Sequence, residues 1–216
     1  MTSNEEVIVA VHAGDVEKLR TLLAKNSALA SARDANGVSA IMHSLYRHQA
    51  EMTKLLLAAG PELDIFEATT LGRRERVAEF LQRDPALAKS WSPDGFTALH
   101  LACFFAQEET AILLLQAGAD AGAEARNPMK VAPLHSAAAG HSVPIVKALL
   151  EHGAPPNARQ QGGWTAMHEA AQRGDKPMVE LLLKKGADRA AANDEGMTAV
   201  QLATKNGHAE VAKLLE

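Results

Sequence analysis

The sequence repeats itself at an interval of about 33 residues, and this period restricts the fold more than any other feature of the chain. Each interval holds a leucine-rich segment, and successive segments are 34, 24, 34, 35, 33 and 33 residues apart. The residues that mark the segments are Leu22, Leu56, Phe80, Leu114, Leu149, Leu182 and Leu215. A unit of this length cannot bury its own apolar face, so neighbouring units must stack into a continuous core. The period therefore predicts a row of seven stacked units.

The most regular unit covers residues 163–188 and reads GWTAMHEAAQRGDKPMVELLLKKGAD. It predicts a short alanine-rich helix that begins after Thr165, a turn at Gly174, and a leucine-rich helix that ends before Gly186. This unit resembles the ankyrin repeat, which has Gly-x-Thr-Pro-Leu-His, two alanines, Gly-His, Ile-Val, Leu-Leu and Gly-Ala-Asp at fixed offsets. The resemblance implies an all-α solenoid of helix-turn-helix units with β-hairpin or turn fingers. It also implies a scaffold that binds other proteins.

We expect one domain that spans residues 1–216. Its repeats are predicted at residues 4–33, 34–64, 65–91, 92–124, 125–159, 160–192 and 193–216. The third repeat is about ten residues short of a full period. We therefore expect the chain to enter a helix directly at Ile65, capped by Asp64, and one finger of the row to be missing.

The start of each short helix follows a Thr-x-x-His pattern in two repeats, Thr97 with His100 and Thr165 with His168. We expect the threonine to accept an amide hydrogen from the first turn, and the histidine to bond back to it or to the adjacent repeat. Three other pairs match the Thr-x-x-His pattern only in part, so we expect their hydrogen bonds to be weaker. They are Ser39 with Met42, Ala132 with His135 and Thr198 with Gln201.

The turn between the two helices of the fourth repeat departs from the family pattern. Ala106 and Gln107 stand there, where the family has Gly-His. A left-handed backbone is unfavourable for any residue with a Cβ atom. The sequence therefore argues against a standard left-handed turn at this position.

Composition limits the classes of partner. The formal net charge of −4 argues against a protein that coats nucleic acid, which needs a clustered basic excess. A single cysteine excludes an intrachain disulfide, and the first residues show neither a signal peptide nor a membrane-spanning run. We expect a cytoplasmic monomer with no membrane or nucleic-acid partner and no cofactor; export by a route without a classical signal stays open.

The residues that could carry chemistry are few. None of the nine histidines forms a His-x-x-x-His pair, so we expect no metal site. His100 and Cys103 lie three residues apart on one predicted helix and could form an activated thiolate, although a buried, inert cysteine is the alternative. Arg73, Arg74 and Arg76 are interleaved with glutamates and are interpreted as a solvated helix face. We expect no catalytic residue.

The short helices should present one face to a concave groove. The residues predicted on that face are His12, Tyr46, Arg47, Thr70, Leu71, Phe104, Phe105, Ala139, Gln172, Arg173, Lys205 and Asn206. Exposed aromatic residues with arginine nearby are typical of binding hot spots. From the groove and the finger tips we select these protein-binding candidates: Tyr46, Arg47, Phe96, Phe104, Phe105, Met129, Trp164 and Arg173. For Phe105 and Trp164 the alternative is packing against the solenoid itself.

These features together predict a non-enzymatic scaffold that binds a protein partner through its groove and finger tips. Two alternatives are kept. The chain could be an enzyme or regulatory subunit that uses His100 and Cys103, or it could be one module of a larger complex.

Overall fold

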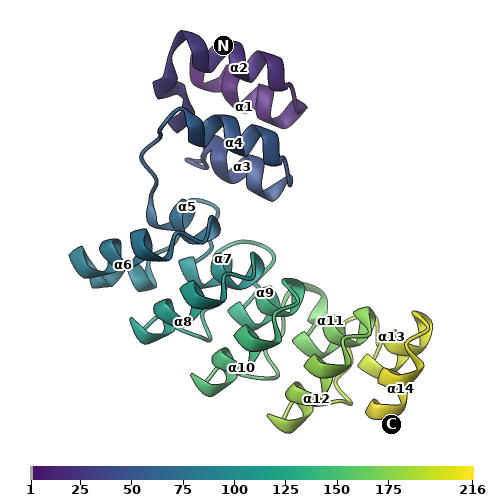
Figure 1. Ribbon diagram of the computed structural model, residues 1–216. Coiled ribbons are helices and arrows are strands. Elements are labelled where there is room, and N and C mark those ends of the chain that lie inside the picture. Colours follow the sequence, from purple (N-terminus) through teal and green to yellow (C-terminus); the bar gives the residue numbers. More distant parts are fainter. Residues whose placement is uncertain (1) are drawn as a thin grey trace.

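Fourteen α-helices, arranged as seven consecutive pairs, make up the computed structural model, which describes residues 2–216 (Figure 1). The first helices of the pairs are α1 (Ser3–Ala13), α3 (Ala40–Tyr46), α5 (Ile65–Thr70), α7 (Ala98–Phe104), α9 (Pro133–Ala139), α11 (Ala166–Arg173) and α13 (Ala199–Lys205). The second helices are α2 (Val16–Lys25), α4 (Ala50–Ala58), α6 (Arg74–Arg83), α8 (Glu108–Gln116), α10 (Val143–Glu151), α12 (Lys176–Lys184) and α14 (Ala209–Leu215). The predicted all-α solenoid is confirmed.

Fingers connect most of the pairs. Three of them close with isolated antiparallel bridges, Arg33 to Ser39, Trp91 to Thr97 and Ala192 to Thr198. Short 3₁₀ helices lie in the connections, namely η1 (Ser27–Ser31), η2 (Pro85–Lys89) and η3 (Gln161–Gly163). Neighbouring fingers touch closely at Gly95, whose carbonyl accepts the Arg126 amide at 2.8 Å. A Cβ atom on Gly95 would lie 2.7 Å from the Arg126 carbonyl oxygen, so only glycine fits there.

The core lies between the two rows of helices that Figure 1 shows from α5 to α14. Along one row α7 packs against α9, α9 against α11, and α11 against α13. These helices approach closely because their facing positions are alanine, as at Ala102, Ala138 and Ala171. Leucines of the second helices fill the remaining space, and Leu114 and Leu149 are fully buried. Each pair thus completes its core only with its neighbours.

The solenoid is interrupted once, between α4 and α5. The large apolar clusters separate there, one running from Val7 to Leu56 and the other from Ile65 to Leu215. Figure 1 shows α4 and α6 apart, whereas the other second helices pack on their neighbours. The predicted absence of a finger explains the gap, because the chain passes directly into α5. Asp64 caps that helix as expected, accepting the Glu67 amide at 2.8 Å.

Polar and apolar contacts cross this interruption. The Arg33 guanidinium pairs with Asp64 at 3.0 Å and with the buried Glu67 at 3.5 Å. The Tyr46 hydroxyl donates a hydrogen bond to the Asp94 carboxylate at 2.7 Å. A small buried cluster of Val38, Met42 and Leu101 joins the two blocks. The second and fourth repeats therefore meet directly, across the place that a third finger would have occupied.

The turn at Ala106 corrects the expectation from sequence. Ala106 has a φ of 53°, so the left-handed turn is kept although no glycine is present. His48 and His141 occupy the same position in their repeats, with φ of 54° and 57°. Stacking on neighbouring repeats holds each pair at one crossing geometry, and the turn residue adopts the backbone that this geometry needs. The strain at these residues is offset by packing elsewhere.

Replacing Ala106 by glycine should therefore stabilise the protein. We expect a gain of about 0.5 to 1 kcal/mol, because relief of the left-handed strain exceeds the extra entropy of the unfolded chain. Urea unfolding followed by circular dichroism measures the change. The matched control is Ala24→Gly at an exposed site within α2, which should lose up to about 1 kcal/mol. A lower free energy of unfolding in Ala106→Gly than in the wild type would show that the left-handed backbone of Ala106 is not strained.

Candidate functional site

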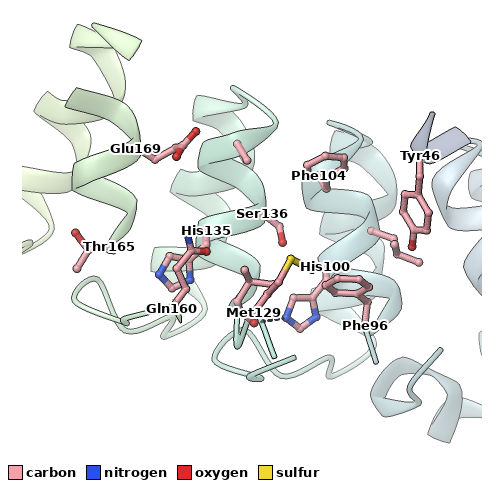
Figure 2. A pocket seen from close by; sticks show the side chains of 13 residues that line it. Tyr46, Phe96, His100, Phe104, Met129, His135, Ser136, Gln160, Thr165 and Glu169 are labelled. Atoms are coloured by element: carbon pink, nitrogen blue, oxygen red, sulfur yellow. Dashed lines mark hydrogen bonds between the residues drawn. The ribbon is translucent and has the colours of Figure 1, made fainter. Parts of the chain in front are cut away.

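A pocket of about 340 Å³ opens between α7 and α9, beneath the fingers of the fourth to sixth repeats. We call it the α7–α9 pocket. Figure 2 shows its two sides, with Tyr46, Phe96 and Phe104 on one and Gln160, Thr165 and Glu169 on the other. Ser136 and Met129 lie between them. The surface of the pocket is mostly apolar, with Gln160, Thr165 and Glu169 as the polar residues on the side of α11 and Ser136 between the two sides.

The pocket exists because α9 carries small residues where it faces the groove. These are Ser136 and Ala139, followed by Gly140. The end of α9 also approaches α7 closely, since a Cβ atom on Gly140 would lie 2.4 Å from the Cys103 carbonyl oxygen. The small residues of α9 therefore form the floor of the pocket. The Phe104 side chain of α7, which is 43% exposed, projects on one side of this floor.

The finger that precedes α9 supplies the pocket's roof. Met129 is 46% exposed and lines the pocket together with Val131. The Met129 carbonyl accepts the Gln161 amide at 3.0 Å, which ties this finger to the next one. The position of Met129 is thus set by hydrogen bonds of the backbone, while its flexible thioether side chain remains free to adapt to an occupant.

Tyr46 is the most distant contributor in sequence. It reaches the pocket because the third finger is missing, and its hydroxyl is anchored on Asp94. Burial and the neighbouring Asp94 carboxylate raise the pKa of Tyr46 far above its usual range, so the phenol stays neutral. The Phe105 ring lies 6.1 Å from the Tyr46 ring and 5.2 Å from the Phe104 ring. Phe105 thus packs against Tyr46 and Phe104, the rings that form the aromatic side of the pocket.

His100 and His135 form part of the lining, and both have a structural role. The Nδ1 atom of His100 accepts the Thr97 amide at 3.2 Å, and its Nε2 donates to the Val131 carbonyl at 3.0 Å. His135 repeats the arrangement with the Ala132 amide at 2.9 Å and the Ala158 carbonyl at 3.0 Å. Each histidine therefore links the start of its own helix to the next finger. The sequence predicted this role for His100 but a weaker pair at Ala132 and His135, where the distance from amide to ring nitrogen is 2.9 Å against 3.2 Å at His100.

His168 and Thr165 confirm the pattern and correct one detail. The His168 Nδ1 atom accepts the Thr165 amide at 3.1 Å, and Nε2 donates to the Met197 carbonyl at 3.1 Å. The Thr165 hydroxyl lies 2.8 Å from the same Nδ1 atom and accepts no helix amide. The expectation of a threonine cap was wrong at this site, because the His168 amide donates to the Thr165 carbonyl at 3.1 Å instead of to the hydroxyl. Ala132 has no hydroxyl, yet its backbone amide is still satisfied, because the amide donates to the Nδ1 atom of His135.

These buried histidines predict a loss of stability in acid. Burial lowers the pKa of His100 to about 4, and it also lowers the pKa of His135 and of His168. The unfolded chain takes up protons below about pH 6.5 while the folded chain does not, so stability is full above that pH and falls below it. For His100 alone the loss at pH 5 should be about 2 kcal/mol.

The variant His100→Gln tests this assignment by urea unfolding at pH 7 and pH 5. The chain itself shows that glutamine keeps the helix cap, because Gln201 accepts the Thr198 amide at 2.8 Å. Since glutamine does not titrate, the pH dependence should shrink by about 2 kcal/mol, whatever the stability at pH 7. An unchanged difference between the two pH values would contradict the assignment.

The proposed pairing of His100 with Cys103 is not formed. Both ring nitrogens of His100 are engaged by Thr97 and Val131. Cys103 is fully buried in the core, and burial raises the pKa of its thiol far above its usual range. The geometry is that of an inert core cysteine.

The rate of alkylation of Cys103 tests whether its thiol is buried and unreactive. With iodoacetamide we expect the native thiol to react slower by on the order of 10³-fold than in denaturing urea, because the reaction requires the core to open. The control is Cys103→Ala combined with Ala13→Cys, which places a thiol at an exposed position and should label rapidly. Equal labelling rates of Cys103 in the native and unfolded protein would show an accessible thiol.

The remaining chemical candidates behave as surface groups. Arg76 pairs with Glu79 at 2.7 Å and covers the Phe80 ring, so this face of α6 is an ion-paired surface. His12 and His43 lie with ring nitrogens 3.3 Å apart, and His43 bonds Asp34. Across residues 2–216 no three His, Cys, Asp or Glu side chains are grouped as a metal ion would require.

The structure brings four of the eight predicted binding residues into the pocket, Tyr46, Phe96, Phe104 and Met129. Phe105 is half-buried behind Tyr46, and Trp164 is half-buried with its ring 5.8 Å from that of His168. For Phe105 and Trp164 the packing alternative describes the geometry well. Two arginines are exposed outside the pocket: Arg47 follows α3, and Arg173 pairs with Glu169 at 2.6 Å. Their role in binding stays a prediction.

Sequence reasoning missed eight lining residues. It assigned other roles to His100, His135 and Thr165, and it did not consider Leu101, Val131, Ser136, Gln160 and Glu169. Three of them, Leu101, Ser136 and Glu169, follow the histidine position of their repeats, and this register could have identified them. Val131 and Gln160 belong to fingers, and their direction depends on contacts between fingers that the repeat pattern does not describe.

The fold defines a helical repeat solenoid, and the pocket opens on one of its faces. A family model described as ankyrin repeats matches residues 65–160 and residues 134–216, so that 152 of 216 residues are covered. The chain therefore belongs to the ankyrin-repeat family, whose members generally serve as protein–protein interaction modules. The matched region begins at Ile65, where the second apolar cluster also begins.

A human protein, BCL-6 corepressor-like protein 1 from Homo sapiens, is 31% identical to the chain over 100 residues. That stretch is 46% of this chain and 6% of the human protein, so the similarity concerns a small part of the relative. Between residues 2 and 216, no helix has both the length and the apolar character that crossing a bilayer would demand.

Proposed function

We propose that this chain is a non-catalytic binding module that holds a segment of a partner protein over the α7–α9 pocket. One observation carries the proposal. Of the described residues, the large apolar side chains that stay exposed are Val9, Phe104 and Met129, and the last two line the same pocket. Apolar side chains exposed together at one concave site are typical of interaction surfaces.

The arrangement also has the features of a binding hot spot. Aromatic residues from two repeats form one side, and the finger of a third repeat covers it. The fingers are fixed to one another by backbone hydrogen bonds, so little ordering is needed when a partner binds. In this proposal the chain acts in the cytoplasm as a monomer, without a cofactor or metal, and Arg47 and Arg173 contact the partner at the edges of the groove.

The double variant Phe104→Ala with Met129→Ala tests the proposal. Both side chains are exposed, so the fold should be kept, as circular dichroism would verify. Affinity capture from the native host identifies partners of the wild-type chain, and each partner's Kd is then measured against the variant. We expect a loss of at least about 30-fold, because two hot-spot side chains together contribute 2 kcal/mol or more.

The control is Val9→Ala, which removes an equally exposed apolar side chain on α1, far from the pocket. It should leave binding unchanged. If the double variant binds every captured partner as tightly as the wild type does, the pocket is not the site of interaction.

A further inference from the structure

The α7–α9 pocket has an apolar side and a polar side, and two of its polar residues, Ser136 and Gln160, carry groups without partners. Ser136 is only 7% exposed and lines the pocket, where its hydroxyl points between the two sides (Figure 2). Within residues 2–216 no group forms a hydrogen bond with this hydroxyl. Two other buried hydroxyls do bond the backbone of their own helix, the Ser44 hydroxyl with Ile41 and the Thr70 hydroxyl with Phe66. Ser136 is therefore available to an occupant.

Gln160 adds a second group of the same kind. Its side-chain amide faces the pocket and has no hydrogen-bond partner in the described part of the chain. Both the serine hydroxyl and the glutamine amide can donate and accept hydrogen bonds. An occupant that fills the pocket with carbon alone would bury these groups unpaired, which weakens binding.

The charge of the pocket selects against an ion. Glu169 is the one charged side chain of the lining, and Arg173 already pairs with it at 2.6 Å. Burial lowers the pKa of both His100 and His135, so the two rings are neutral. A lysine or arginine of a partner would have to lie beside Arg173, and a carboxylate beside Glu169. The complementary occupant is uncharged.

We propose that the pocket receives one tyrosine side chain of the partner protein, an inference that rests on the proposed function. The ring packs against Phe104, Tyr46 and Met129, where aromatic and thioether contacts are favourable. The phenol hydroxyl meets Ser136 and Gln160, donating to one and accepting from the other. Phenylalanine leaves both groups unpaired, and the indole of tryptophan can donate but not accept.

Small probes test the chemistry without any partner protein. The shift of the Met129 methyl group, assigned with Met129→Leu, is followed by NMR during titration with p-cresol, toluene and 3-methylindole. We expect p-cresol to bind about five-fold more tightly than toluene, because its hydroxyl pairs with the free groups. A purely apolar pocket would prefer toluene, since the phenol must give up its water.

Two variants and one control locate the effect. Ser136→Ala removes a hydroxyl that stabilises nothing in the fold and should reduce the preference for p-cresol, because only Gln160 then remains to pair with the phenol hydroxyl. Ala139→Leu should fill the pocket and abolish binding of all three probes, whereas Gln172→Leu, at the equivalent position of the next repeat, should leave them unchanged. A preference for toluene, tighter binding of 3-methylindole than of p-cresol, or no saturable shift would each overturn the tyrosine assignment.

The two proposals can fail separately. If a captured partner is lost in the double variant while p-cresol shows no preference, protein binding at the pocket stands and the tyrosine inference is wrong. If p-cresol is preferred but no partner depends on Phe104 and Met129, the proposed function fails, and the assignment of the tyrosine to a protein partner fails with it.

Discussion

The hydrogen bond from a buried histidine of one repeat to the backbone of the next is the interaction on which the rest of this structure depends. His100, His135 and His168 each tie the start of a first helix to the following finger. Because the rings are buried and neutral, water competes little for these bonds. They set where each finger lies relative to the helix beneath it. The positions of Met129 and Gln160 over the pocket follow from this spacing.

These hydrogen bonds from a histidine to the next finger are absent where the solenoid is interrupted. The second repeat has Met42 at the equivalent position and the third has Glu67, which caps its own helix and meets Arg33. Met42 has no finger to hold, because the third finger is missing, and the two apolar clusters part between the second and third repeats. The interruption has a consequence for the site, because it lets Tyr46 reach Asp94 and contribute to a pocket two repeats away.

The same small residues serve packing and the pocket. Alanines let α7 and α9 approach closely, and Gly140 lets the end of α9 touch the backbone at Cys103. The side chains of α9 that face the groove are also small, so the α7–α9 pocket forms between Phe104 and Glu169. Larger side chains at these positions would both strain the stack and fill the hollow. Stability of the row and availability of the pocket are therefore linked through the same contact.

The repeat architecture, the missing finger, the cap at Asp64 and the structural role of His100 and His168 could be predicted from the residues along the chain. These features depend on local patterns of period, capping and turn residues, which one repeat contains in full. The left-handed backbone of Ala106 depends on tertiary packing, since stacking on both sides overrides the local preference. The meeting of Tyr46, Phe104 and Met129 around Ser136 likewise depends on packing, because these residues lie up to 90 positions apart in the sequence. Sequence patterns within a repeat carry no information on which neighbouring side chains a break in the row will bring together.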